Sequence, residues 1–120
     1  EEGFVYIQDR IKDMIVSGGE NIYSTEVEAA LFAHPEIIDA AVIGVPNEKY
    51  GEVVKACIVK KEDSDLTEED VINFCKDRIA SYKKPQSIDF IDEVPRNASG
   101  KVLKKVLREP YWKDQDRQVS

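Results

Sequence analysis

Two long apolar runs in the middle of the chain place the strongest constraint on its fold. Residues 37–45 are apolar and β-prone apart from Asp39, and residues 53–60 form a second run of the same character. Turn-forming residues 46–51 separate the two runs. Runs of this length with little polar surface are typical of strands in the centre of a sheet. The pattern therefore predicts two central strands joined by a loop.

Shorter patterns predict the elements before these strands. We expect two short strands joined by a charged turn, at residues 4–7 and 14–16, and then a loop over residues 17–23. Thr25 and Glu28 have the spacing of a capping box, which predicts that a helix begins there. That helix should end near Pro35, because the residue before a proline resists the helical conformation.

The second half of the chain predicts two more helices and a strand. Acidic residues gather at 67–70, where the helix dipole favours them, so a helix should begin there and close at residues 81–85. We expect a third core strand at 88–91, a last helix at 102–108 and a loose tail after it. The element order β-β-α-β-β-α-β-α is that of a small α+β domain, with a mixed or antiparallel sheet, two main helices packed on it and a short C-terminal helix.

Charge and cysteine content narrow the classes of partner. The 120 residues carry a net charge of −7, which argues against nucleic acid or an anionic membrane as the main partner. Cys57 and Cys75 stand alone, and His34 is the one histidine, so a zinc site is not expected. Unclustered cysteines fit the reducing cytoplasm, and neither a signal peptide nor a membrane-spanning apolar run is present.

Lys101 ends the most distinctive turn of the chain. Pro95, Asn97, Ser99 and Gly100 are turn formers that directly precede it. A lysine on such a turn presents a compact cation on a long stem, which suits a carboxylate or a phosphate. The alternative is an ordinary solvated lysine at a helix start. The spacing is not that of a P-loop, because proline occupies the position of its first glycine.

Two other stretches allow a functional and a plain interpretation. The adjacent Gly18 and Gly19 permit positive φ or close approach to the backbone, so they form either an ordinary loop or the wall of a channel. The charged residues 9–13 would, from pattern alone, be a solvated hairpin tip.

Three segments together resemble one family. They are Asp9-Arg-Ile-Lys-Asp-Met-Ile-Val-Ser-Gly-Gly-Glu-Asn-Ile-Tyr23 with Glu26-Val-Glu28, then residues 45–52, then Pro95-Arg-Asn-Ala-Ser-Gly-Lys101. Their order and spacing resemble the C-terminal domain of the adenylate-forming acyl-CoA synthetases. The resemblance implies the end of a hinge segment at 1–12, the domain at 13–109 and the tail at 110–120. The start at Glu1, without methionine, suggests a piece of a longer protein.

The resemblance also implies a reaction. A carboxylic acid reacts with ATP to give acyl-AMP and pyrophosphate, and CoA then displaces AMP. The domain is expected to rotate against an N-terminal AMP-binding domain between the two steps. ATP and CoA would be substrates, with Mg²⁺ accompanying ATP and held outside this chain. The isolated domain should be inactive.

The family's functional residues can be carried over by position. Lys101 corresponds to the catalytic lysine that bridges the carboxylate and the α-phosphate, and it could be a target of a lysine acetyltransferase. The other assignments are Arg10, Lys12 and Asn21 for ATP or AMP, Asp9 and Lys12 for the hinge, and Ser17, Gly18, Gly19, Lys83 and Lys84 for CoA.

Two alternatives stay open beside the CoA ligase. One is another branch of the superfamily, which loads a carrier protein or carries out an oxidative, luciferase-like reaction. The other is a free-standing α+β ligand-binding module without chemistry of its own.

Overall fold

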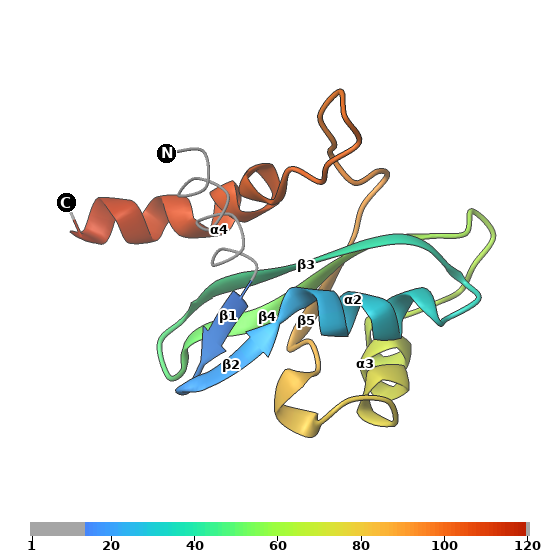
Figure 1. The fold of residues 1–120 in the computed structure, drawn as a ribbon, viewed down its shortest axis with the longest axis horizontal. Coiled ribbons are helices and arrows are strands. Elements are labelled where there is room, and N and C mark those ends of the chain that lie inside the picture. The colour runs from blue at the N-terminus through green and yellow to red at the C-terminus, as the bar shows by residue number, and fades with distance from the viewer. Residues whose placement is uncertain (1–13, 120) are drawn as a thin grey trace.

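A three-stranded mixed sheet forms the centre of the molecule (Figure 1). The computed structural model describes residues 14–119, with side chains through Trp112. In the sheet, β3 (Ile37–Asn47) pairs antiparallel with β4 (Gly51–Lys60), and β5 (Ser87–Phe90) pairs parallel with the other edge of β4. The two predicted central strands and the third core strand are confirmed.

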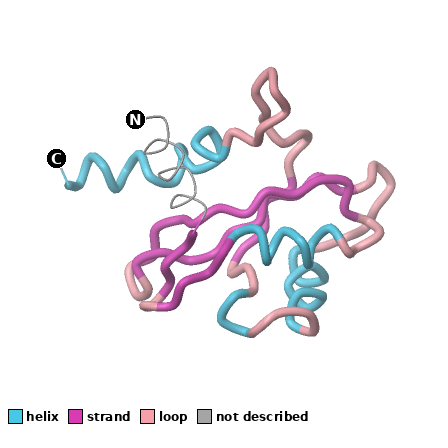
Figure 2. The backbone as a smooth tube through the Cα atoms, viewed as in Figure 1, coloured by secondary structure: helices cyan, strands magenta, loops and turns pink. Residues whose placement is uncertain are grey.

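Helices cover both faces of this sheet (Figure 2). On one face lie α2 (Ser24–Phe32), α3 (Glu68–Lys76) and a separate hairpin of β1 (Met14–Ser17) and β2 (Glu20–Tyr23). The opposite face carries α4 (Lys104–Val119). The predicted α+β class, with two main helices packed on a mixed sheet, is confirmed.

The two covered faces explain why the central strands read as continuous apolar runs. Side chains alternate between the faces of a strand. In β4, Val54 and Ile58 enter the core beneath α2 and α3, whereas Val53 and Cys57 enter a smaller core beneath α4. A strand buried on both faces has no room for the polar half of an alternating pattern.

The predicted loop at residues 17–23 is largely wrong. Residues 20–23 form β2, which pairs with β1 so that Ile22 lies opposite Ile15, and both side chains are buried. Gly18 and Gly19 make the two-residue turn between the strands. A pair of glycines between two short β-prone runs is itself a hairpin signal, which the predicted loop did not take into account.

The capping box predicted at Thr25 and Glu28 is also wrong. The N-cap of α2 is Tyr23, which makes no side-chain capping hydrogen bond. The Glu28 carboxylate instead accepts a hydrogen bond from the N–H of Val42, at 2.9 Å, and pairs with Lys104. These tertiary contacts replace the local cap. The true capping box lies at the start of α3, where Thr67 and Asp70 cap each other's backbone N–H groups.

Two helix ends differ from the prediction. Helix α3 ends at Lys76 rather than at residues 81–85. The Arg78 N–H donates to the carbonyl of Cys75 three residues before it, a 3₁₀-type bond that tightens the last turn. A short 3₁₀ turn, η1 (Ser81–Lys83), follows.

Helix α4 continues beyond the predicted end at Arg108, through Pro110 and as far as Val119, so the loose tail predicted after it is wrong. Contacts with the sheet hold the chain after the proline: Tyr111 packs into the smaller core, and the Trp112 Nε1–H donates to the carbonyl of Gly44 at 2.8 Å.

Candidate functional site

A single asparagine side chain organises the loop that carries Lys101. Oδ1 of Asn97 accepts hydrogen bonds from the N–H groups of Ser99 and Lys101, at 2.9 and 3.0 Å. The Asn97 N–H donates to the carbonyl of Lys101 at 3.0 Å, and Arg96 and Val102 close the loop with a β-bridge. Gly100 supplies the positive φ, 88°, that the reversal needs. The loop therefore holds the backbone of Lys101 in one conformation.

Arg96 fastens this loop to the central sheet. Its guanidinium donates to both carboxylate oxygens of Asp39 on β3, at 2.6 and 3.1 Å. The hydrogen bond from Arg96 is the main reason that the pKa of Asp39 lies below its ordinary value. Such a two-point contact fixes orientation as well as distance, so the loop bearing Lys101 has a defined position relative to β3.

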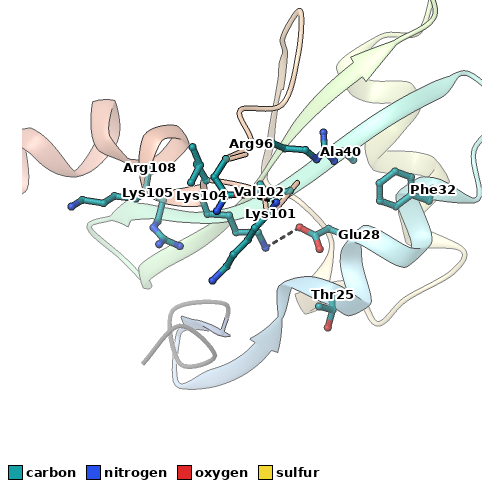
Figure 3. A pocket seen from close by; sticks show the side chains of 12 residues that line it. Thr25, Glu28, Phe32, Ala40, Arg96, Lys101, Val102, Lys104, Lys105 and Arg108 are labelled. Atoms are coloured by element: carbon teal, nitrogen blue, oxygen red, sulfur yellow. Dashed lines mark hydrogen bonds and ion pairs between the residues drawn. The ribbon is translucent and has the colours of Figure 1, made fainter. Parts of the chain in front are cut away.

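Lys101 lies at the edge of a cationic pocket of about 480 Å³ between α2 and the start of α4 (Figure 3). Lys104 crosses the pocket to Glu28, with Nζ 2.9 Å from the carboxylate, and it also donates to the hydroxyl of buried Ser24 at 2.8 Å. Positively charged side chains outnumber the one carboxylate, which suits an anionic ligand. The cations that line the pocket are Arg96, Lys101, Lys104, Lys105 and Arg108.

The predicted CoA-binding glycines form the exposed tip of the β1–β2 hairpin. Ser17, the third predicted residue of this stretch, is the last residue of β1. Gly18 and Gly19 have φ of 57° and 86°, the left-handed conformations of a two-residue hairpin turn. The Gly18 N–H donates to the carbonyl of Tyr50 at 2.9 Å, and a Cβ on Gly18 would lie 3.0 Å from the Tyr50 ring. A Cβ on Gly19 would meet nothing within 4 Å. Gly18 thus packs against the loop after β3, while Gly19 faces open space.

The two predicted CoA-binding lysines lie in and just after η1. Nζ of Lys83 is 2.8 Å from a carboxylate oxygen of Glu26 on α2, and this hydrogen bond raises the pKa of Lys83. Nζ of Lys84 lies 3.4 Å from both the carbonyl and the hydroxyl oxygen of Ser81. Both side chains therefore have protein contacts as well as exposure to solvent.

The structure does not bring all the predicted site residues together. The Lys101 loop and the Gly18–Gly19 turn lie on opposite sides of the molecule (Figure 1). Asn21 is exposed on β2, opposite Val16. Asp9, Arg10 and Lys12 lie outside the described residues. Within the part of the chain that is described, Lys101 and the glycine turn form two separate candidate sites.

A cluster of polar groups beneath α4 was not predicted from the sequence. Nζ of Lys55, a nearly buried residue of β4, lies 3.0 Å from the Asp89 carboxylate and 5.0 Å from the centre of the Tyr111 ring. The Tyr111 hydroxyl donates to the same carboxylate, which is the main cause of a rise in the pKa of Tyr111 to about 12. A lysine inside an apolar run was the available signal, because a buried lysine needs a partner.

The described side chains hold no group of three or more His, Cys, Asp or Glu residues that could bind a metal ion. No helix in the described part of the chain is long and apolar enough to cross a membrane.

Several known proteins with similar sequences are CoA ligases. A long-chain-fatty-acid–CoA ligase of Mycobacterium tuberculosis, FadD13, is 46% identical over 92% of this chain, and a 2-succinylbenzoate–CoA ligase of Bacillus mycoides is 47% identical over 90%. The solved structure of a Mycobacterium tuberculosis fatty acyl CoA synthetase superimposes with a TM-score of 0.81 and 43% identity over 88% of the chain.

This chain corresponds to only part of those proteins. It spans 22% of the length of each of the two ligases and 21% of the solved synthetase chain. The sequence profile of the AMP-binding enzyme C-terminal domain matches residues 26–101, which include most of α2, the central sheet and the Lys101 loop. The chain therefore belongs to the family of AMP-binding enzyme C-terminal domains.

Proposed function

We propose that this chain is the C-terminal domain of an ATP-dependent acyl-CoA ligase. The observation that carries the proposal is Lys101, exposed on a loop whose backbone is fixed by Asn97 and whose base is tied to β3 by Arg96. Membership of the AMP-binding family and the names of its relatives support the same conclusion. The partner is an N-terminal AMP-binding domain of the same protein.

The proposed reaction has two steps. In the first, an oxygen of the carboxylic acid attacks the α-phosphorus of ATP, and pyrophosphate leaves. In the second, the CoA thiolate attacks the acyl carbon, and AMP leaves with the electron pair of the broken C–O bond. Lys101 stabilises negative charge between the carboxylate and the α-phosphate in the first step, where positioning and electrostatics supply most of the catalysis. Mg²⁺ accompanies ATP and is held outside this chain.

The second step would use the other end of the molecule. The open space beside Gly19 suits a slender thiol arm that passes close to backbone, with Ser17 and Gly18 beside it. Lys83 and Lys84 would approach the CoA phosphates. Because Lys101 and this turn lie on opposite sides (Figure 1), both can serve one reaction centre only if the domain rotates between the steps.

The remaining assignments concern the nucleotide and the hinge. Arg10 and Asn21 would contact ATP or AMP, Lys12 would contact the nucleotide and act in the hinge, and Asp9 would belong to the hinge. The proposed boundaries are hinge 1–12, domain 13–109 and tail 110–120. A lysine acetyltransferase acting on Lys101 would remove its charge and switch off the first step. A cytoplasmic location fits the two unpaired cysteines, Cys57 and Cys75.

Two half-reactions test this proposal on the full-length protein. Carboxylate-dependent exchange of pyrophosphate into ATP reports the first step, and consumption of CoA thiol reports the second, across a panel of fatty and aryl acids. Activity in both is expected. Exchange without thiol consumption would favour the carrier-loading or oxidative branch of the superfamily. Absence of both from a folded full-length protein would overturn the ligase proposal.

A further inference from the structure

We infer that Glu52 is a positioning residue for the Gly18–Gly19 turn, and thus for the thioester-forming step. The inference extends the proposed function, because it assumes that the turn serves CoA. Glu52 is not one of the residues assigned to the site by family resemblance. It lies on β4, far from the turn in sequence, but its side chain reaches the strand that carries the turn.

The key contact joins the main sheet to the hairpin. A carboxylate oxygen of Glu52 accepts a hydrogen bond from the backbone N–H of Val16, at 2.8 Å. Val16 lies two residues before Gly18, in the strand β1 that leads into the turn. A carboxylate that accepts from a backbone N–H forms a charge-assisted hydrogen bond, stronger than a neutral one.

Gly44 leaves the space that the Glu52 side chain needs. A Cβ on Gly44, in the neighbouring strand β3, would lie 2.3 Å from a carboxylate oxygen of Glu52. A Cβ at position 44 and the Glu52 side chain could not both occupy their present positions, because real contacts between a Cβ and another heavy atom are longer. Gly44 and Glu52 therefore form one unit, in which the missing side chain on β3 lets the carboxylate reach β1.

A second contact fixes the turn from the same side. The Gly18 N–H donates to the carbonyl of Tyr50, two residues before Glu52. The loop that contains Tyr50 is itself ordered, because Oδ1 of Asn47 accepts from the N–H groups of Lys49 and Tyr50, both at 2.9 Å. The hairpin tip is thus held at two points, Val16 and Gly18, by the segment from Tyr50 to Glu52.

The arrangement predicts a selective effect on the second half-reaction. Loss of the Glu52 acceptor would remove one of the two contacts that hold the hairpin tip. It would loosen Gly19, which bears the open face of the turn, and would leave the contacts of the Lys101 loop intact. Glu52→Ala should raise the KM for CoA about tenfold, the scale of one charge-assisted hydrogen bond, and leave pyrophosphate exchange within about twofold. Glu52→Gln keeps an acceptor oxygen and should restore most of the CoA affinity.

The test is made on the full-length ligase. The second half-reaction is started from supplied acyl-adenylate, so that KM and kcat for CoA are separated from adenylation. Glu48→Ala is the matched control, since Glu48 is an exposed glutamate of the loop between β3 and β4. Gly44→Ala should behave like Glu52→Ala, because it displaces the carboxylate. Equal loss in both half-reactions, or a CoA KM unchanged in Glu52→Ala, would overturn the inference.

Hydrogen exchange separates this inference from the proposed function. If wild-type protein exchanges pyrophosphate into ATP but uses no CoA, the CoA-ligase proposal fails. Hydrogen exchange of the backbone amides alone then decides whether Glu52 positions the turn. Amides of residues 14–23 should exchange faster in Glu52→Ala than in wild type, and Glu52→Gln should restore their protection. Unchanged amide protection in Glu52→Ala would overturn the positioning role, whichever molecule accepts the acyl group.

Discussion

Lys101 owes its position mainly to Asn97. The asparagine oxygen accepts from two backbone N–H groups of the loop, and its own N–H returns a bond to the Lys101 carbonyl. Asparagine favours such turns because its short side chain can imitate a backbone carbonyl. Because the backbone of Lys101 is already fixed, only the freedom of its side chain is lost when the ammonium group binds an anion. The loop is thus suited to place a charge.

Replacing Lys101 by alanine should separate the two half-reactions of the proposed ligase. In the full-length protein we expect pyrophosphate exchange to fall about a hundredfold or more, the loss typical of a group that stabilises developing charge. Thioester formation from supplied acyl-adenylate should fall far less. Lys61→Ala, which removes an exposed lysine elsewhere, serves as the control. Similar losses in both steps would contradict the assignment of Lys101 to adenylation.

At the scale of elements, local contacts were predictable and distant ones were not. The start of α3 was predicted from its acidic first turn, and its cap joins Thr67 and Asp70, which are three positions apart. The start of α2 was misread because Glu28 bonds to the N–H of Val42, 14 residues away, and to Lys104 on another element. A sequence pattern cannot reveal a partner that only the fold supplies.

The same reason explains what was found and missed in the candidate sites. Lys101 and the two glycines carry local signals, namely turn formers and a glycine pair. The roles of Glu52 and Tyr111 depend on contacts between strands and helices distant in sequence. Gly44 gave no useful signal by itself, because glycine is needed there only to leave room for the Glu52 side chain that passes over it. Motif resemblance proposed roles for the first group. It covered residues 45–52 but gave Glu52 no role.

The hairpin turn gives a prediction about bulk at Gly19. Gly19→Leu should block thioester formation while leaving pyrophosphate exchange nearly intact, because the added side chain would fill the open space beside the turn. Gly19→Ala is the control for backbone strain, since any L-residue there must adopt a φ of 86°, at a cost of about 1–2 kcal/mol. If alanine and leucine reduce CoA use equally, strain rather than bulk is the cause.

The anchoring of α4 gives a prediction about pH. Tyr111→Phe removes the hydrogen bond to Asp89 and should lower the free energy of unfolding by about 1 kcal/mol at neutral pH, a modest value because the pair is partly exposed. The pKa of folded Tyr111 is raised to about 12 from an ordinary 10.0. A group with a raised pKa stabilises the fold fully below its unfolded value and loses that contribution as the pH rises through the folded value.

The stability difference between wild type and Tyr111→Phe should therefore be constant from neutral pH to about pH 10 and shrink between pH 10 and about 12. Urea unfolding of the 120-residue chain at several pH values measures it. A difference that persists undiminished near pH 12 would show that the Tyr111 hydroxyl contributes nothing through Asp89.

Considered as a whole, the molecule presents two candidate sites that lie far apart (Figure 1). The chain carries a net charge of −7, yet five cations gather around the pocket beside Lys101. Charge separated in this way attracts an anion to one end without making the whole molecule bind anions. The glycine turn at the other end offers an open backbone surface in place of charge. Two unlike surfaces on one rigid domain fit two successive tasks, performed in two orientations.

This division predicts that the 120-residue chain alone catalyses neither half-reaction. Lys101 is exposed at the edge of its pocket, so water would screen its charge from a bound nucleotide unless a second domain covered the site. Pyrophosphate exchange and thiol consumption should both stay at background, while circular dichroism shows a folded chain and the full-length protein is active in parallel. Exchange above background by the chain alone, lost in Lys101→Ala, would mean that these residues suffice for adenylation.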